Sequence, residues 1–328
     1  PHLNDDNIQI KISEKKEFQY KYDGDIAPTI KEFQDKAEKM CNSKFILAPH
    51  QEFVKRFMSS HTPYNGLLLY HGTGSGKTCS AIGIAEDMRE YLKYSGKIQR
   101  IIVVASPNVQ ENFKTQLFDE RKLVKTSNGW SLTGCINDVF LQELSSFNFN
   151  KLNKTKIITK IKKLINKYYM FIGYTSFANY IRKISNVEHS IKNRHQLIKQ
   201  KLKSIFTGRL VIIDEVHNIR LSDNNKEHKY VAGELQKLID NVEQIKLLFL
   251  SATPMYNQPS EIVFILNLLN KNDGRSQIMV KDVFDKSGNL RISSSGEEIG
   301  KNILHNKSSG YISYVRGENP YTFPYRIF

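Results

Sequence analysis

The sequence has few cysteines, and this limits the sites that it could build. Its 328 residues contain three, Cys41, Cys79 and Cys135, with no CxxC pair and no cysteine and histidine spacing typical of zinc ligands. A secreted fold held together by disulfides normally has a dense and even set of cysteines. We therefore expect neither a disulfide framework nor a zinc site.

Long apolar runs are also missing. The longest, such as Gly66–Tyr70 and Ile101–Ala105, have the length of a strand, whereas a membrane helix needs about 20 apolar residues. No signal peptide is visible, so we expect an intracellular protein with no membrane partner. Pro1 is not an initiator methionine and the last residues continue a patterned segment, so we expect a longer parent protein.

Acidic residues are scarce in one part of the chain. Lys and Arg number 48 against 33 Asp and Glu, which gives a net charge of +15. Residues 144–213 hold fifteen basic residues and a single acid, Glu188, so almost the whole excess lies there. A basic face in this segment would attract polyanions through phosphate contacts and counterion release. A lysine-rich surface that is only solvated is the alternative.

Apolar runs alternate with amphipathic stretches, which predicts an α/β fold: a doubly wound, mostly parallel sheet with flanking helices. Ligand sites in such sheets lie at the carboxyl ends of the strands. We divide the chain into a lead-in at 1–44, a nucleotide-binding domain at 45–270 with a lysine-rich insertion at about 144–205, and an extension at 271–328. The candidate core strands are residues 66–70, 100–105, 169–173, 210–214 and 246–251.

The run His71-Gly-Thr-Gly-Ser-Gly-Lys-Thr78 follows the first predicted strand and precedes a predicted helix. Glycines at this position let the backbone turn and aim its N–H groups at phosphates, and the start of the helix adds a favourable dipole. Lys77 should reach the β- and γ-phosphates of ATP, and the Thr78 hydroxyl should bind Mg²⁺. The predicted ATP-binding residues of this loop are Gly72, Thr73, Gly74, Ser75, Gly76, Lys77 and Thr78.

Two adjacent carboxylates end the strand Leu210-Val-Ile-Ile-Asp-Glu-Val-His217. In a phosphate site, one carboxylate holds Mg²⁺ while its neighbour orients and deprotonates the attacking water. We assign Asp214 to the metal and Glu215 to the base. A polar strand end without chemistry is the alternative reading of this pair taken alone.

Asp214-Glu-Val-His217 has the DExH form of superfamily 2 helicases, and Ser251-Ala-Thr-Pro254 resembles the third motif of that superfamily. The resemblance implies the first of two RecA-like helicase domains. It also implies that His217, Ser251 and Thr253 couple ATP hydrolysis to nucleic-acid contacts. The alternative for His217 is an ordinary surface histidine.

Further segments are similar to other motifs of these ATPases. Leu47-Ala-Pro-His-Gln51 resembles the glutamine motif, so Gln51 is our predicted adenine contact, with an amide that donates and accepts at once. Val103-Val-Ala-Ser-Pro107 and Gly173-Tyr-Thr-Ser-Phe177 resemble the motifs that hold a nucleic-acid backbone, and strand-end turns are the alternative. The candidate nucleic-acid contacts are Ser106, Asn108, Tyr174 and Thr175.

Two segments narrow the resemblance, Ser251–Ile262 and Gly310–Pro324. Together they are similar to ATPases of large DNA viruses, in the group of the poxvirus early transcription factor small subunit and nucleoside triphosphate phosphohydrolase I. The resemblance implies a virion-packaged, DNA-dependent ATPase of early viral transcription in the host cytoplasm. It implies duplex DNA, viral RNA polymerase or another early transcription factor subunit, and a second RecA-like domain of the same longer chain as partners.

No segment resembles the QxxGRxxR motif, whose arginines complete the ATP site from the second motor domain. We therefore expect this chain to bind ATP and Mg²⁺ but to hydrolyse ATP weakly. Two other functions stay open: a DNA-binding or polymerase-recruiting scaffold switched by ATP, and an RNA helicase, which would share every motif of the ATP site.

Overall fold

The computed structural model describes residues 1–5, 7–19, 29, 31, 34–35, 38, 45–97, 99–127, 129–144, 152–188, 192–220 and 225–316. Parts of the predicted lead-in and of the lysine-rich insertion, and the end of the Gly310–Pro324 segment, lie outside these residues. Among the helices that are described, none is long and apolar enough to cross a membrane.

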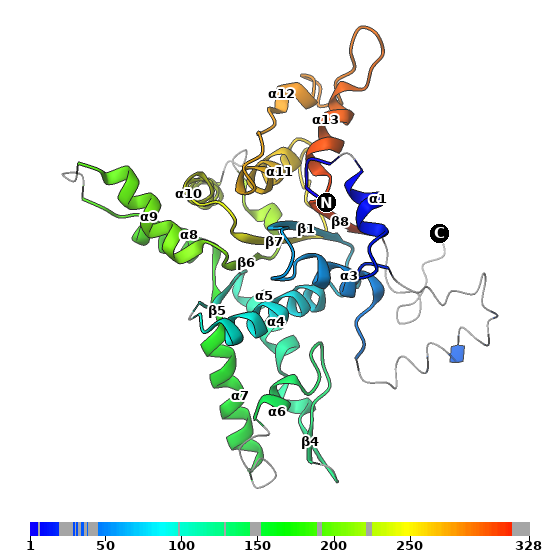
Figure 1. The fold of residues 1–328 in the computed structure, drawn as a ribbon, viewed down its shortest axis with the longest axis vertical. Helices are drawn as coiled ribbons and strands as arrows, with labels where there is room; N and C mark the ends of the chain where they lie inside the picture. Colours follow the sequence, from blue (N-terminus) through cyan, green and yellow to red (C-terminus); the bar gives the residue numbers. More distant parts are fainter. Residues whose placement is uncertain are drawn as a thin grey trace.

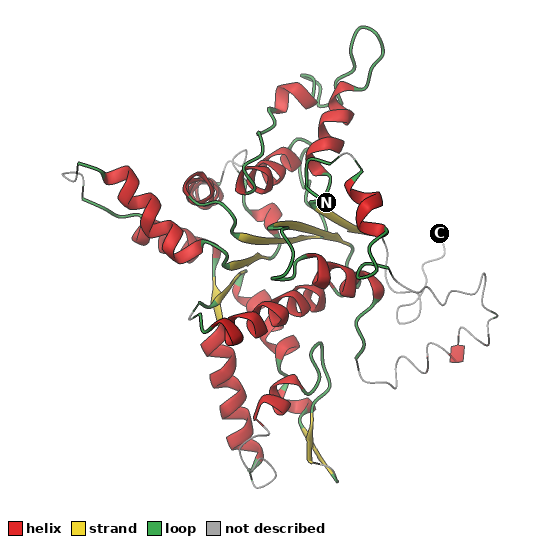
Figure 2. Ribbon diagram, viewed as in Figure 1, coloured by secondary structure: helices red, strands yellow, loops and turns green. Residues whose placement is uncertain are grey.

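The first half of the domain alternates strands and helices (Figures 1 and 2). Its elements are α1 (Ile8–Ser13), α3 (Pro49–Phe57), β1 (Gly66–His71), α4 (Lys77–Ser95), β2 (Ile101–Val104), α5 (Pro107–Leu117), the 3-10 turn η1 (Glu120–Lys122), β3 (Val124–Thr126), β4 (Gly129–Ser131), α6 (Val139–Leu144) and α7 (Lys154–Tyr168).

The second half repeats this alternation and ends on a short strand. Its elements are β5 (Tyr169–Ile172), α8 (Tyr174–Ile184), α9 (Arg194–Phe206), β6 (Leu210–Ile213), the 3-10 turn η3 (Val216–Asn218), α10 (Lys226–Asn241), β7 (Lys246–Ser251), α11 (Glu261–Asn272), α12 (Val280–Val283), α13 (Ile299–Ser308) and β8 (Ile312–Val315).

Six strands form the central sheet in the order β5-β2-β6-β7-β1-β8, and every neighbouring pair is parallel. The five strands predicted from the sequence are all present, so the doubly wound α/β fold is confirmed. Because all strands run the same way, their carboxyl ends meet at one edge, where His71, Ile213 and Ser251 lead into the three predicted motifs.

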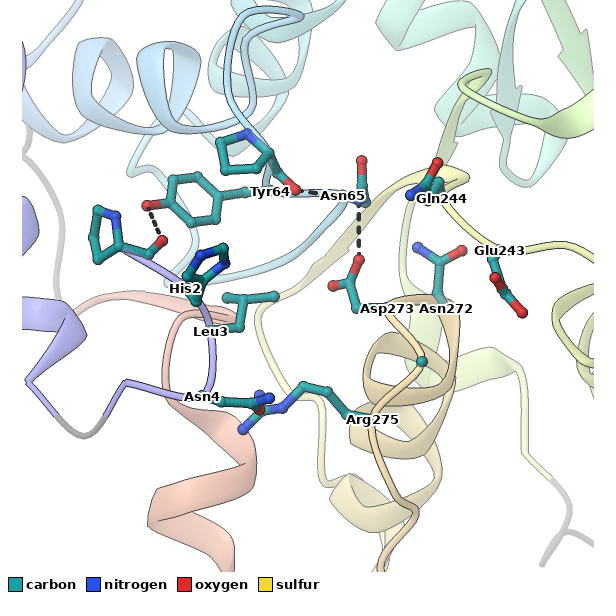
Figure 3. Close-up of a pocket in the computed structure, with 13 residues that line it drawn as sticks. His2, Leu3, Asn4, Tyr64, Asn65, Glu243, Gln244, Asn272, Asp273 and Arg275 are labelled. Atoms are coloured by element: carbon teal, nitrogen blue, oxygen red, sulfur yellow. Dashed lines mark hydrogen bonds between the residues drawn. The ribbon is translucent and has the colours of Figure 1, made fainter.

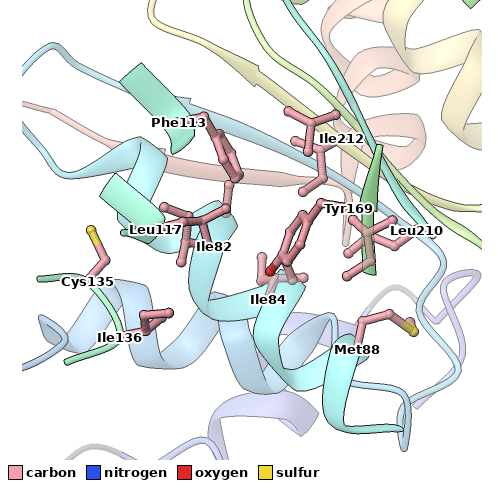
Figure 4. Close-up of a cluster of buried hydrophobic side chains, with 14 of the residues drawn as sticks. Ile82, Ile84, Met88, Phe113, Leu117, Cys135, Ile136, Tyr169, Leu210 and Ile212 are labelled. Atoms are coloured by element: carbon pink, nitrogen blue, oxygen red, sulfur yellow. The ribbon is translucent and has the colours of Figure 1, made fainter. Parts of the chain in front are cut away.

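The strands bury both faces, as crossover helices require. Leu67, Leu69, Val103 and Ile212 point into one core cluster with helices α3 to α7, part of which Figure 4 shows. Their neighbours along the strands point into a second cluster with α8 to α11, because side chains alternate along a strand. These neighbours are Leu68, Val104, Val211 and Ile213, and Phe249 of β7 points into the same second cluster.

The predicted domain boundary at residue 270 does not coincide with the end of the sheet. After α13 the chain returns, and β8 pairs with β1 in the register Leu68↔Ile312 to His71↔Val315. The four residues of β8, Ile312-Ser-Tyr-Val315, follow a long polar and glycine-containing stretch, and this strand was not predicted from the sequence. Residues 280–308 form an arm above α11 in Figure 1.

Cys79 and Cys135 form a disulfide, with Cα atoms 5.4 Å apart. A single bridge is not the disulfide framework that the sequence argued against, but the wide spacing of the cysteines did not predict this pair. The fold brings the first turn of α4 beside the segment before α6, although 56 residues separate the two cysteines. Spacing along a chain reports zinc motifs well, but it says little about pairs that tertiary structure brings together.

Reduction of this disulfide is expected to lower the free energy of unfolding by roughly 2–4 kcal/mol, because the open chain regains the entropy of a loop of this length. Urea unfolding with and without dithiothreitol would measure the change. The Cys79→Ser variant should match the reduced protein and should not respond to reductant. A wild-type midpoint that reductant leaves unmoved would mean that the two thiols are not joined in solution.

A cavity of about 270 Å³ lies at the opposite edge of the sheet, where β1 and β7 begin (Figure 3). Asn65 donates to the Asp273 carboxylate at 3.0 Å, and the Tyr311 hydroxyl donates to its other oxygen at 2.9 Å. Burial raises the pKa of Asp273. These contacts tie the start of β1 to the end of α11 and to the residue before β8, which is a structural role.

Candidate functional site

The phosphate loop joins β1 to α4 through two glycines in the left-handed region. Gly74 has φ 79° and Gly76 has φ 80°, a conformation that side chains other than glycine rarely adopt. A Cβ atom on Gly76 would also lie 2.3 Å from Gln51 Nε2. The loop therefore needs glycine here both for its backbone turn and for the close approach of helix α3.

Helix α3 holds the loop from the side. Gln51 Nε2 donates to Gly76 O at 3.0 Å, its Oε1 accepts from Ala48 N at 2.8 Å, and His50 Nε2 lies 3.0 Å from Ser75 O. Gln51 is 4% exposed. The predicted adenine residue thus lies against the phosphate loop, with one donor and its oxygen already used inside the protein. His50 is a loop contact that the sequence did not single out.

The lysine of the loop meets the second carboxylate of the DExH segment. Lys77 Nζ lies 3.8 Å from Glu215 Oε1, and both side chains are partly shielded, at 13% and 34% exposure. Glu215 has φ 47°, in the left-handed region, although it is not glycine. Such a residue costs about 1 kcal/mol or more and persists only where surrounding contacts fix it. Two of the four predicted catalytic side chains, the phosphate-binding Lys77 and the base Glu215, therefore lie close together.

Asp214, the residue before Glu215, is buried, with 4% exposure. Burial, with the adjacent charge of Glu215, raises the pKa of Asp214 to about 6. Its Oδ1 accepts from Glu215 N at 2.9 Å. The carboxylates of Asp214 and Glu215 carry more negative charge than Lys77 balances, and a divalent cation would offset the remainder. The Thr78 hydroxyl, one position after Lys77, adds another oxygen donor. This donor set fits Mg²⁺ bound with a nucleotide.

His217 lies between the Glu215 carboxylate and the end of the neighbouring strand β7. Its Nδ1 lies 3.2 Å from Glu215 Oε2 and 2.9 Å from the Ser251 hydroxyl at the end of β7. Ser251 Oγ in turn accepts from Thr253 N at 3.0 Å. Burial lowers the pKa of His217, which favours the neutral ring. The three predicted coupling residues are therefore joined by hydrogen bonds, and the chain that they form begins at His217, beside the Glu215 carboxylate.

An aromatic ring that the sequence did not identify covers His217. Tyr256 stacks on the imidazole with centroids 5.7 Å apart and planes 11° apart, and the Arg220 guanidinium lies 5.3 Å from the Tyr256 ring. Arg220 pairs with Glu261 at 3.2 Å. The Glu261 carboxylate also accepts from Tyr256 N at 2.8 Å. These contacts of Glu261 and Arg220 hold the loop after β7 in place, and the exposed Tyr256 ring stacks on His217.

The substitution Tyr256→Ala is expected to raise the pKa of His217 towards its ordinary value, because it removes the ring that shields the imidazole from water. NMR titration of the imidazole signals would measure this. Tyr256→Phe keeps the ring and should leave the titration unchanged. If Tyr256→Ala also leaves it unchanged, the tyrosine does not shield His217 in solution.

The candidate nucleic-acid residues lie at the same edge of the sheet, but in different settings. Ser106 precedes α5 and its side chain makes no capping bond, and Asn108 is exposed in the first turn. The Tyr174 hydroxyl donates to Asp214 O at 2.7 Å, and burial raises its pKa to about 12. Thr175 donates to Glu227. The first pair is open to a ligand, whereas the second pair already contacts the protein.

The phosphate loop is also tied to the edge strand β8. Gly72 N donates to Val315 O at 3.1 Å, and His71 Nε2 lies 2.9 Å from the Ser313 hydroxyl. Burial lowers the pKa of His71 to about 4, so the ring is neutral at physiological pH. His71 replaces the first glycine of the usual phosphate-loop pattern, and here it anchors the loop to the last described strand.

Comparisons with known proteins agree on one family for this chain. The model of the SNF2-related domain matches residues 50–306. Two proteins of Acanthamoeba polyphaga mimivirus named as candidate ATP-dependent RNA helicases are 29% and 30% identical, over 91% and 86% of this chain. A protein of African swine fever virus named as an early transcription factor large subunit homologue is 24% identical over 85% of it.

These relatives are much longer than this chain, which spans 25% and 43% of the two mimivirus proteins and 28% of the African swine fever virus protein. Among solved structures, the Sulfolobus solfataricus SWI2/SNF2 ATPase core in complex with double-stranded DNA is 18% identical, with a TM-score of 0.42. That match covers 84% of this chain and 45% of the other.

Proposed function

Because the chain belongs to the SNF2-related domain family, we propose that it is the ATP-binding half of a DNA-dependent ATPase that acts in viral early transcription. The observation that carries this proposal is the approach of Lys77 to Glu215 at 3.8 Å. It brings a phosphate-binding cation and a carboxylate base to one point, at the end of the sheet where the fold presents its ligands. The viral relatives support a role inside infected cells.

Each residue then has a distinct task. The backbone N–H groups of Gly72–Gly76 and the Lys77 ammonium hold the phosphates, Gln51 fixes the loop beside the adenine, and Thr78 with Asp214 would hold Mg²⁺. Bound Mg²⁺ supplies positive charge to the phosphate oxygens. When Lys77 turns to the phosphates it leaves Glu215, whose carboxylate is then free to take the proton of the attacking water.

Coupling to nucleic acid would run from the Glu215 carboxylate to the adjacent His217 and along the hydrogen bonds that join His217 to Ser251 and Thr253. His217 links the base to Ser251, and Thr253 follows in an exposed loop. A ligand at the open start of α5, near Ser106, would lie on the same edge of the sheet. Nucleic-acid binding could therefore reposition the base without any direct contact to ATP.

We propose that the chain after β8 leads to the second RecA-like domain of a longer protein. Arginines from that domain would complete the ATP site, so the 328-residue chain should bind ATP but turn it over slowly. Phosphate release by this chain and by its longer parent protein, each with and without duplex DNA, tests both parts. Turnover by the chain alone within about threefold of the parent protein would contradict the need for a second domain.

The mimivirus relatives named as RNA helicases favour RNA as a second candidate activator. ATPase rates of the parent protein with duplex DNA and with duplex RNA at equal phosphate concentration would decide between them. A scaffold that uses ATP only as a switch is the other candidate, favoured by the transcription factor relative. It predicts intact promoter-dependent transcription when hydrolysis is removed by Glu215→Gln.

A further inference from the structure

Helix α7 carries a row of lysines along one side. Lys156, Lys160, Lys163 and Lys167 are spaced by four, three and four residues within the helix. This spacing places side chains above one another on an α-helix. At a rise of about 1.5 Å per residue, the row is about 16 Å long. The row therefore presents four positive charges along one line.

Packing on the opposite side of α7 fixes where this row points. Ile157, Ile161, Ile165 and Tyr168 are at most 7% exposed and belong to the core cluster that also contains Tyr169. The helix is also capped, because the Asn153 side chain accepts from Lys156 N at 2.9 Å. The helix cannot turn without exposing its isoleucines. Lys156, Lys163 and Lys167 are accordingly exposed, and Lys160 is half-buried.

Three lysines of this row, Lys156, Lys163 and Lys167, have no acidic partner among the described residues. The sequence has no Asp or Glu between Glu143 and Glu188. Glu120, from the neighbouring turn η1, pairs at 2.9 Å with Lys162, which lies on another side of the helix. Within the described ranges, no carboxylate oxygen lies within 4.0 Å of the amino groups of Lys156, Lys163 or Lys167. Like charges one turn apart repel each other, so an external polyanion would relieve that repulsion.

The row is remote from the ATP site. Helix α7 runs directly into β5 at Tyr168 and Tyr169, so it lies at the amino end of that strand. The phosphate loop and the DExH segment lie at the carboxyl ends. Figure 1 shows α7 extending from β5 away from the rest of the sheet, on the side opposite the α12 and α13 arm. Ligands of the two regions would therefore not compete.

We propose that the α7 lysine row binds the phosphate backbone of duplex DNA, as a second contact outside the ATP-coupled edge of the sheet. The inference rests on the proposed DNA partner and adds a surface that no motif assigns. The row would follow about five base pairs, at 3.4 Å per pair along each strand. Lysine meets phosphates as a point charge and reads no bases. The contact therefore adds affinity that depends on salt, without sequence preference.

The test uses the triple variant Lys156→Gln, Lys163→Gln and Lys167→Gln, with binding to a labelled duplex of about 20 base pairs measured over a salt series. Each lysine that contacts phosphate should lower the slope of log affinity against log salt by about one. The triple variant should therefore lose about three units of slope and bind at least about tenfold more weakly near 0.1 M salt. The matched control is Lys15→Gln, Lys16→Gln and Lys286→Gln, which removes the same charge from exposed positions elsewhere.

Wild-type slope and affinity in the α7 variant would overturn the proposal, as would an equal loss in the control, which would reflect net charge alone. A loss confined to duplex RNA would also overturn it. Thermal unfolding and binding of a fluorescent ATP analogue should be the same in both variants and the wild type. Failure of the wild type to bind DNA at all would instead contradict the proposed function, and failure to bind ATP would contradict it separately.

Discussion

Glu215→Gln is expected to slow ATP hydrolysis by about 10²- to 10⁴-fold while ATP still binds. The substitution keeps the shape of the side chain but removes the carboxylate that would take the proton of the attacking water, and general-base catalysis contributes a factor of this size. It also releases Lys77, whose ammonium lies 3.8 Å from Glu215 Oε1. ATP affinity should therefore stay within about threefold of wild type, or rise.

Single-turnover phosphate release in the parent protein with duplex DNA would measure the rate, and a fluorescent ATP analogue would measure binding. Glu90→Gln is the matched control, because Glu90 is an exposed carboxylate on α4 that the proposal does not use. It should hydrolyse ATP at the wild-type rate. A Glu215→Gln protein with more than about a tenth of wild-type turnover would assign the base to another residue.

Lys77→Ala is expected to weaken ATP binding by about a hundredfold, which corresponds to about 2.7 kcal/mol. The ammonium is the charged side chain of the loop and is 13% exposed, so its contact with phosphates is only weakly screened. Its loss also leaves Glu215 without its cation beside the incoming phosphates. Equilibrium binding of a fluorescent ATP analogue with Mg²⁺ to the 328-residue chain would measure the effect without any need for hydrolysis.

The control for this variant is Lys93→Ala, which removes the same charge from the last turn of the same helix. Lys93 is 45% exposed and lies 3.5 Å from Glu143, far along α4 from the loop. Its ATP affinity should equal that of the wild type. If Lys77→Ala binds ATP as tightly as Lys93→Ala does, the glycine loop is not a phosphate site.

The sequence predicted the sheet and the position of the glycine loop between β1 and α4, because both depend on local patterns. Each buried strand reads as a short apolar run, and parallel topology then brings the segments after His71, Ile213 and Ser251 to one edge. The predicted binding of phosphate and metal at that edge requires particular residue types at fixed spacing, such as the glycines before Lys77 or the adjacent pair Asp214 and Glu215. Such patterns are visible without coordinates.

Features that depend on long-range contacts were not predictable in this way. Ser313 and Val315 join the phosphate loop from more than two hundred residues away, in a strand of four residues. Tyr256 reads as an ordinary exposed aromatic until its ring is seen on His217. The Cys79–Cys135 bond likewise has no local signature, since only the packing of α4 against the segment before α6 brings the two sulfurs together.

The pairing of β8 with β1 has a mechanical consequence. The two strands are parallel over four residue pairs, and Val315 O holds the N–H of Gly72, the first residue of the glycine loop. Tension on the chain that follows Val315 would load these hydrogen bonds in shear, all at once, rather than peel them apart one by one. The edge strand would then act as a tether that carries a pull directly to the phosphate loop. Force on the chain after Val315 would therefore change the affinity of the phosphate loop for ATP.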